Sequence, residues 1–160
     1  LDTLFDKHCE KGFPIDLEKD ILPYGDNSID VVLAFNIFEH IYNYAFLLKE
    51  IRRILKPHGR VIGAVPFLVG YHPDPHDFWR FTNESLEKIF RAAGFGNSTI
   101  TILGIGPVFA GYSQIEFMLP KLLKIFIVPF VCLCDRIILI CAPRLDTRKF
   151  ALGLFFTFSK

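Results

Sequence analysis

One block of the chain, residues 21–59, changes its hydrophobic period and thereby predicts a strand followed by a helix. Residues 29–35, IDVVLAF, are a short and mostly apolar run rich in β-branched side chains, which is typical of a strand buried on both faces. Residues 45–55 place apolar side chains on one helical face and charged side chains on the other. Gly59 ends the helix, and a second apolar strand follows at residues 61–66. This order predicts a βαβ unit and a parallel sheet.

Further segments extend the predicted α/β fold on both sides of this unit. Residues 13–17 are expected to form the preceding strand. Residues 82–93 predict a helix, with Thr82 or Asn83 as its N-cap and Gly94 as its end. The last two predicted strands are residues 98–103 and residues 151–159.

Five segments of this sequence resemble one protein family when they are taken together. They are LPYGDNSIDVV at 22–32, FNIFEHI at 35–41, LLKEIRRILKPHGRVIGAVPF at 47–67, YHPDPHDFWRFT at 71–82 and LEKIFRAAGF at 86–95. This series resembles the second half of a class I S-adenosylmethionine-dependent methyltransferase, of the type 11-like group that methylates small molecules and lipids. The resemblance implies a partial Rossmann-like methyltransferase sheet, mostly parallel, with an antiparallel closing strand. It also implies S-adenosylmethionine as the cofactor and a small-molecule or lipid-like acceptor.

The glycine-rich cofactor loop of that family has no counterpart in this sequence. Gly12 is the only glycine among the first twenty residues, and the chain begins with Leu1. We therefore expect residues 1–160 to be a single partial domain, the C-terminal part of a longer methyltransferase. The alternative is a non-catalytic, methyltransferase-like binding or scaffold module. A nicotinamide-dependent dehydrogenase is disfavoured, because the motifs have no counterpart in such enzymes.

Four residues near the strand ends are candidates for cofactor binding, because ligands of open parallel sheets bind at the carboxyl ends of the strands. In the resemblance, Asp16 takes the place of an acidic residue that faces the adenine amino group, and Leu17 flanks the ring. Two alternatives stay open: Asp16 caps a turn, or Asp20 makes the adenine contact. Asn36 corresponds to a position beside the methionine part of the cofactor, unless it only caps a turn, and Phe38 follows on the same loop.

Two histidines, His40 and His76, are the candidate catalytic residues. Methyl transfer depends mainly on holding the donor and the nucleophile in a near-attack pose, and a base is needed only where the acceptor loses a proton. A neutral imidazole at His40 suits either the lining of the transfer channel or that proton transfer. A histidine that only bonds to backbone is the alternative.

The segment 71–82 is the candidate acceptor-binding loop. His72 is expected to make polar contacts, Trp79 to form a lid or wall, and Arg80 to anchor an anionic group. Alternatively, Arg80 and Asp77 tie this loop down, and Trp79 belongs to the core.

The same loop resembles a metal site only superficially. Its potential ligands are His72, Asp74, His76 and Asp77. Pro73 and Pro75 prevent the helix that would align two histidines, and no further ligand is evident. We therefore expect no metal.

His58 departs from the family pattern, which has glycine at this position before the second strand. That glycine serves the turn into the strand. Histidine tolerates a positive φ better than a branched side chain does, so we expect the turn to persist.

An apolar segment, residues 117–143, lies before the last strand, within an expected helical insertion at 112–146. Its longest uncharged stretch, residues 125–134, is well below the about 20 apolar residues of a membrane-spanning helix. Pro120 and Pro129 should break or kink a helix. Two interpretations stay open. One is a hairpin that covers the sheet edge or the mouth of the site, and the other is peripheral membrane contact, with phenylalanines in lipid and basic residues near headgroups.

Charge and cysteine content narrow the partners and the compartment. The net charge is +1 at pH 7, so no basic field favours nucleic acid. The four cysteines lack the paired spacing of a metal site, and Cys132 and Cys134 lie in an apolar run. Buried, reduced thiols favour a reducing compartment, so we expect a cytoplasmic protein that is membrane-associated if the apolar segment contacts lipid.

Overall fold

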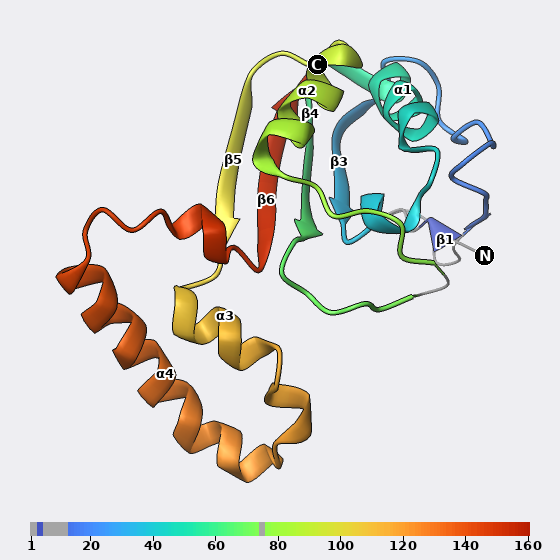
Figure 1. The fold of residues 1–160 in the computed structure, drawn as a ribbon. Helices are drawn as coiled ribbons and strands as arrows, with labels where there is room; N and C mark the ends of the chain where they lie inside the picture. The colour runs from blue at the N-terminus through green and yellow to red at the C-terminus, as the bar shows by residue number, and fades with distance from the viewer. Residues whose placement is uncertain (1–2, 5–12, 74–75) are drawn as a thin grey trace.

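The computed structural model describes residues 3–4, 13–73 and 76–160, and a four-stranded sheet forms its centre (Figure 1). In spatial order the strands are β3 (Ile29–Phe35), β4 (Leu55–Pro66), β6 (Gly153–Ser159) and β5 (Ser98–Leu103). β3 and β4 are parallel, whereas β6 runs antiparallel to both β4 and β5. This confirms the predicted βαβ unit and the antiparallel closing strand. A separate two-stranded sheet consists of β1 (Thr3–Leu4) and β2 (Phe13–Pro14).

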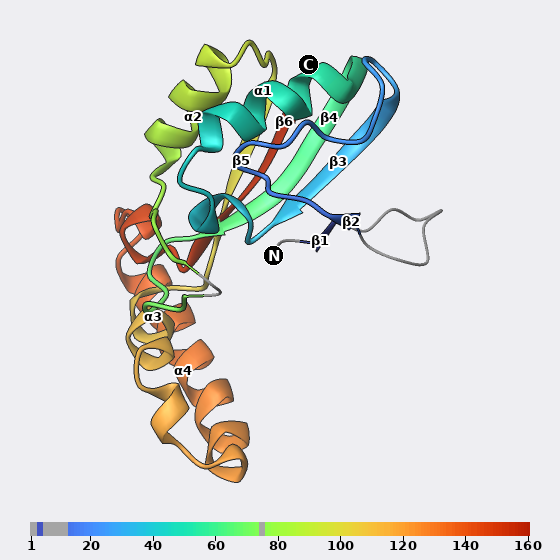
Figure 2. The ribbon, with the colours of Figure 1, turned by 90° about the vertical axis from the view of Figure 1, so that its right-hand side faces the viewer.

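Two helices, α1 (Tyr44–Ile54) and α2 (Asn83–Ala92), cover one face of the four-stranded sheet (Figure 2). Thr82 caps α2 as expected: its hydroxyl accepts a hydrogen bond from the Ser85 N–H, and the Ser85 hydroxyl accepts one from the Thr82 N–H. Phe90 of α2 stacks on Phe158 of β6 with ring centroids 4.0 Å apart. The hydrophobic core therefore lies between these helices and the sheet.

The opposite face of the sheet is open in the part of the chain that the structure describes. Phe35 contacts Phe155, which alternates along β6 with the core residue Phe156, so Phe35 points away from the helices. Val31 and Leu33 share this side of β3, and Leu33 is 66% exposed. Parallel sheets are usually buried on both faces, so this apolar face lacks a usual part of its packing.

A helical hairpin lies beyond the edge of the sheet at which β3, β4 and β5 end (Figure 1). It comprises α3 (Pro107–Ser113), the short 3₁₀ helix η2 (Glu116–Met118) and α4 (Lys121–Cys141). Its helices thus begin five residues before the expected insertion at 112–146. The Gln114 side-chain amide donates to the Leu68 carbonyl at 2.6 Å, which ties the hairpin to the segment after β4. A further 3₁₀ helix, η3 (Thr147–Phe150), leads into β6.

Asp135 of α4 fixes how the two helices of the hairpin meet. Its side chain is fully buried, and its two carboxylate oxygens accept hydrogen bonds from the Val108 and Phe109 N–H groups at 2.9 and 2.8 Å. These are backbone donors in the first turn of α3, which have no partner within the helix. Asp135, which interrupts the apolar run in the sequence, therefore has a structural role.

Two expectations about local structure were wrong. The strand predicted at 13–17 is reduced to β2, and residues 17–19 form a turn. The Asp16 carboxylate accepts the Glu18 N–H at 2.9 Å and pairs with Lys19, and such local bonds compete with strand pairing. Of the break or kink expected at Pro129, the break is wrong, because α4 continues through this residue. Among the described residues, no helix is both long and apolar enough to cross a membrane.

Candidate functional site

Two segments that follow neighbouring parallel strands meet at the carboxyl edge of the sheet. The first contains η1 (Phe38–His40) and follows β3, and the second follows β4. The Glu39 carbonyl accepts hydrogen bonds from the Phe78 and Trp79 N–H groups at 2.8 and 3.3 Å. The Trp79 indole N–H donates to the Ile41 carbonyl at 3.1 Å. These bonds hold the predicted acceptor loop against the segment after β3, where α/β sheets bind ligands.

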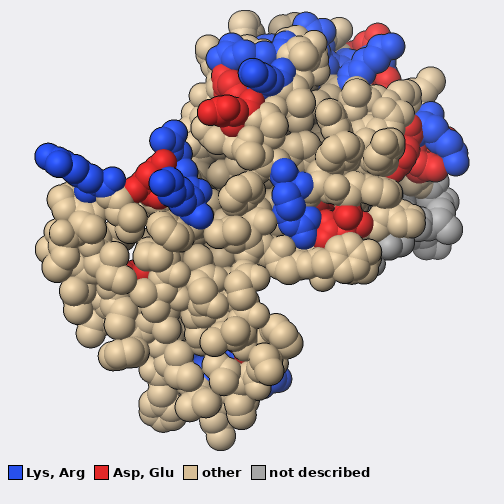
Figure 3. All heavy atoms as spheres, in the orientation of Figure 1, with Lys and Arg blue, Asp and Glu red and all other residues tan. Residues whose placement is uncertain are grey.

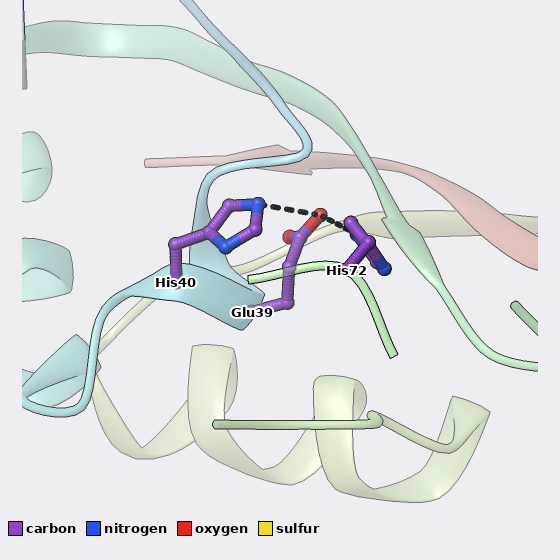
Figure 4. A group of neighbouring side chains, drawn as sticks. All are labelled: Glu39, His40 and His72. Atoms are coloured by element: carbon purple, nitrogen blue, oxygen red, sulfur yellow. Dashed lines mark ion pairs between the residues drawn. The ribbon is translucent and has the colours of Figure 1, made fainter. Parts of the chain in front are cut away.

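Glu39, His40 and His72 form a cluster between these two segments (Figure 4). Glu39 is completely buried, and among the described residues neither of its carboxylate oxygens has a hydrogen-bond partner. Its Oε1 atom lies 3.7 Å from His40 Nε2 and 4.0 Å from His72 Nε2. Burial raises the pKa of Glu39 above its ordinary value, because a charged carboxylate loses hydration there.

The hydrogen bonds of the two histidines fix which nitrogen faces Glu39. His40 Nδ1 bonds to the His76 carbonyl, and His72 Nδ1 bonds to the Gly70 carbonyl at 2.8 Å. A carbonyl oxygen only accepts, so each Nδ1 carries the proton. In the neutral rings both Nε2 atoms therefore have a free lone pair, which is able to accept a proton or to bind a metal ion.

Asp77 and Arg80, both in the acceptor loop, form an ion pair that contacts His72 of this cluster. Arg80 Nη2 lies 2.8 Å from Asp77 Oδ2, and a second bond joins Nη1 to Oδ1. These hydrogen bonds from Arg80 hold the pKa of Asp77 well below its usual range. Asp77 also accepts the His72 N–H at 3.0 Å, so the pair positions His72 directly.

The other N–H groups of the Arg80 guanidinium donate hydrogen bonds to backbone carbonyl oxygens of this chain. Its guanidinium also donates to the carbonyl oxygens of Val69, Gly70 and Trp79. This geometry matches the alternative in which Arg80 ties the loop down. Its predicted contact with an anionic acceptor stays a prediction.

The other predicted acceptor and catalytic residues lie beside the cluster. Trp79 is half-buried between Tyr42, whose ring stacks on it at 5.6 Å, and Tyr44, whose ring meets it edge-on at 5.5 Å. Trp79 also packs against the hydrophobic core, which matches the alternative given for it, and its role as a wall of an acceptor site stays a prediction. His76 is exposed, and its carbonyl rather than its ring contacts His40.

The predicted cofactor residues are spread more widely. Asn36 lies directly after β3 with a φ of 51°, and its N–H donates to the Ala64 carbonyl at 2.9 Å. Phe38 is fully buried against Phe90 and Phe156, so its side chain belongs to the core and gives no support to a cofactor contact. Leu17 is buried too, whereas Asp16 is half-exposed in its turn.

Glu39 is the residue of this site that sequence reasoning missed. The Glu-His pair in FNIFEHI belongs to the family pattern, yet the sequence analysis predicts a site role for His40 alone. The four loop residues weighed as metal ligands do not form the cluster: only His72 belongs to it, and Asp74 lies outside the described residues. Two surface hollows of about 740 and 660 Å³ lie elsewhere, one between α1 and α2 and one beside β5.

Comparison with known proteins finds methyltransferases that are similar to part of this chain. Residues 7–63 match the family described as a methyltransferase domain. A probable S-adenosylmethionine-dependent methyltransferase of Mycobacterium tuberculosis is 27% identical over 92 residues, which cover 54% of this chain and 34% of that protein. The matched segments span only 19% to 34% of the length of the curated relatives. The chain thus matches a minor part of each of them.

Solved structures agree on the fold. A Thermotoga maritima S-adenosylmethionine-dependent methyltransferase, titled as a possible histamine N-methyltransferase, superposes with a TM-score of 0.56 at 16% identity, over 90% of this chain and 61% of that one. The [4+2]-cyclase SpnF superposes with a TM-score of 0.54 at 20% identity, over 91% of this chain and 54% of that one. At these identities the likeness shows the fold alone, the Rossmann-like methyltransferase sheet. Together with the sequence matches, it makes the chain similar, over part of its length, to S-adenosylmethionine-dependent methyltransferases.

Proposed function

We propose that this chain is the acceptor-side part of a methyltransferase that transfers a methyl group from S-adenosylmethionine to a small or lipid-like acceptor. The observation that carries the proposal is the meeting of the segment after β3 with the loop after β4 at the carboxyl edge of the sheet. The first segment holds the cofactor candidate Asn36, and the second holds the acceptor candidates His72 and Trp79. The cofactor supplies an electrophilic methyl group, and the two segments hold the acceptor beside it.

In this proposal His40 stands nearest to the transferred group. The acceptor nucleophile takes the methyl group, and an acceptor that must lose a proton gives it to His40 Nε2. That atom is free to accept it, because Nδ1 is the nitrogen that bonds to the His76 carbonyl. His76 contributes to this through its backbone, and its exposed ring stays a candidate for acceptor contact.

We also propose that the cofactor's amino-acid part is held by residues that this chain does not supply. Among the described residues the apolar face of β3 is open, and the sequence before Asp16 has no glycine-rich loop. A further layer of structure on that face would bury Val31, Leu33 and Phe35 and bring such a loop to the carboxyl edge. In this reading residues 1–160 are one partial domain, with 112–146 as its apolar insertion.

Cofactor binding should appear only when the missing part is restored. We expect no saturable binding of S-adenosylmethionine to this chain in a calorimetric titration. Binding should appear in a version extended upstream through a glycine-rich strand-loop-helix. Asn36→Ala should weaken binding to the extended version, because Asn36 adjoins the proposed cofactor position. Asp30→Asn, at the other end of the same strand, is the matched control. Failure of both folded versions to bind would favour the non-catalytic module.

The hairpin supports a second part of the proposal, contact with a membrane surface. Six exposed apolar residues of α4 follow one another at spacings of three or four, and so lie along one side of the helix: Leu122, Phe126, Phe130, Leu133, Ile137 and Ile140. The lower part of Figure 3, where α3 and α4 lie, shows few charged side chains. Lys121 and Arg136 are exposed residues of the same helix, and in this proposal their long side chains reach toward headgroups. A cytoplasmic enzyme with such a hairpin would meet apolar acceptors at the lipid surface.

Removing large apolar side chains from this stripe should abolish lipid binding. We expect the chain to co-sediment with liposomes, and the double variant Phe126→Ser/Phe130→Ser to stay in the supernatant, since apolar burial drives interfacial binding. Val31→Ser/Leu33→Ser removes exposed apolar residues from the sheet face and is the matched control. Circular dichroism checks that both variants fold. Equal partitioning of the two variants and the parent chain would count against membrane contact.

A further inference from the structure

We propose that Glu39, His40 and His72 bind one divalent transition-metal ion. One carboxylate oxygen and two imidazole nitrogens from these residues lie within 4.8 Å of one another. They come from the two segments that meet at the carboxyl edge, so an ion here would also join these segments. The assignment concerns ion binding alone and holds whether or not the chain takes part in methyl transfer.

The state of Glu39 is the strongest reason for this inference. Glu39 has no hydrogen-bond partner in the part of the chain that the structure describes, and a completely buried carboxylate in that state is rare, because its desolvation is not offset. The two nitrogens nearest to its Oε1 atom offer lone pairs rather than protons in the neutral rings. A cation between the three side chains turns this unfavourable contact into a favourable one.

The surroundings of the histidines are those of metal ligands. A histidine that binds a metal through one nitrogen usually donates its other N–H to a carbonyl or a carboxylate, which fixes the ring. His40 and His72 both do so, toward the carbonyls of His76 and Gly70. Asp77, held by Arg80, lies 3.5 Å from His72 Nδ1 and holds the His72 backbone as well. The supporting contacts are therefore already in place.

The ligand set indicates the class of ion. Two imidazoles and one carboxylate suit Zn²⁺, Mn²⁺ or Fe²⁺, whereas Mg²⁺ and Ca²⁺ prefer oxygen ligands. Bonds of about 2.1 Å would place neighbouring ligand atoms roughly 3.0–3.5 Å apart. The separations of 3.7 and 4.0 Å from Glu39 Oε1 need only a small contraction, whereas the three ligand atoms as a set, which lie within 4.8 Å of one another, must draw closer together. The His72 side chain is 37% exposed, so the ion has a path from solvent.

Such an ion would change how an acceptor loses its proton at the carboxyl edge of the sheet. Three protein ligands leave coordination positions open, and an acceptor oxygen bound there would lose its proton more readily. His40 would then bind the ion and would no longer accept the acceptor's proton. The ion would favour loss of that proton in its place. This consequence rests on the proposed function, whereas ion binding does not.

Metal uptake by the full chain tests the site directly. The chain is stripped with a chelator, its thiols are blocked with N-ethylmaleimide, and it is titrated with Zn²⁺ by calorimetry, with Co²⁺ absorption as a second readout. We expect one ion per chain. Glu39→Gln and His72→Ala should each weaken binding at least about tenfold, since each removes a ligand of the three. His58→Asn removes an exposed histidine outside the cluster, at a positive φ that asparagine tolerates, and should bind as the parent does.

Several results would overturn the inference. One is the absence of saturable uptake by the folded parent chain. Another is unchanged affinity in both Glu39→Gln and His72→Ala, which would mean that Glu39 is instead protonated or paired with protonated histidines. An equal loss of affinity in His58→Asn would indicate nonspecific binding. A folded chain that binds Zn²⁺ at this cluster but never S-adenosylmethionine would retain this inference and reject the proposed function.

Discussion

Replacing Asp77 with asparagine should lower the free energy of unfolding by about 3 kcal/mol, the lower end of the range for breaking a buried ion pair. The Asp77 side chain is 1% exposed and accepts two hydrogen bonds from Arg80 and one from the His72 N–H. Asparagine removes the negative charge and leaves the guanidinium without a counter-ion. Arg80 is 28% exposed, and water partly compensates its charge, which is why we choose the lower end.

Urea unfolding with a matched pair of variants measures this effect. Asp26 also pairs with an arginine, Arg53, but its side chain is 70% exposed. Asp26→Asn should therefore change stability much less than Asp77→Asn does. Equal losses in the two variants would show that burial of Asp77 contributes nothing to the strength of its pair.

The pH dependence of stability has a definite sign. The pKa of Asp77 is lower in the folded chain than its ordinary value of 3.8. Above that value both states are ionised, and the full stabilisation by the ion pair is present. As the pH falls below 3.8, Asp77 is protonated first in the unfolded state. The stabilisation by the ion pair is therefore lost progressively until the pH reaches the lower pKa of the folded chain. The parent chain should lose stability more steeply below about pH 4 than Asp77→Asn does, as urea midpoints would show.

Most of the sheet was predictable because its signals are local. The period change at residues 29–55, the Thr82 cap and the apolar run of the last strand each determine a neighbouring stretch of backbone, and all three predictions are confirmed, with β6 beginning two residues after the expected start at 151. His58 has a φ of 67°, as the substitution for glycine indicated. The strand expected at 13–17 failed because the side chain of Asp16 offers the backbone a turn instead.

The cluster and the hairpin depended on contacts between distant segments, which local patterns do not contain. His72 meets Glu39 only because β4 carries its following loop back across η1. Local sequence placed His40 and His72 near the sheet edge but gave no reason for Glu39 to be buried between them. Asp135 likewise looked like an interruption of an apolar run, and its partners are 26 and 27 residues away.

Replacing Asp135 with alanine should open the hairpin without unfolding the sheet. Alanine leaves the Val108 and Phe109 N–H groups without their partners, each at about 1–3 kcal/mol. Since the hairpin lies outside the hydrophobic core, this loss should appear as local opening. If the two unpaired N–H groups together cost about 3 kcal/mol, amide hydrogen exchange in α3 should accelerate roughly a hundredfold. The amides of β4 and β6 should keep their exchange rates.

The control for this experiment is Asp146→Ala. Asp146 also accepts a backbone N–H, that of Arg148 at 3.1 Å, but it lies at the surface beside η3 and outside the hairpin. It should leave exchange in α3 unchanged. Acceleration of the sheet amides by Asp135→Ala would mean that hairpin and sheet unfold as one unit. In that case the stripe on α4 would be part of a cooperative domain. Local opening would instead make the hairpin a separable attachment, able to move against a lipid surface while the cluster at the carboxyl edge keeps its geometry.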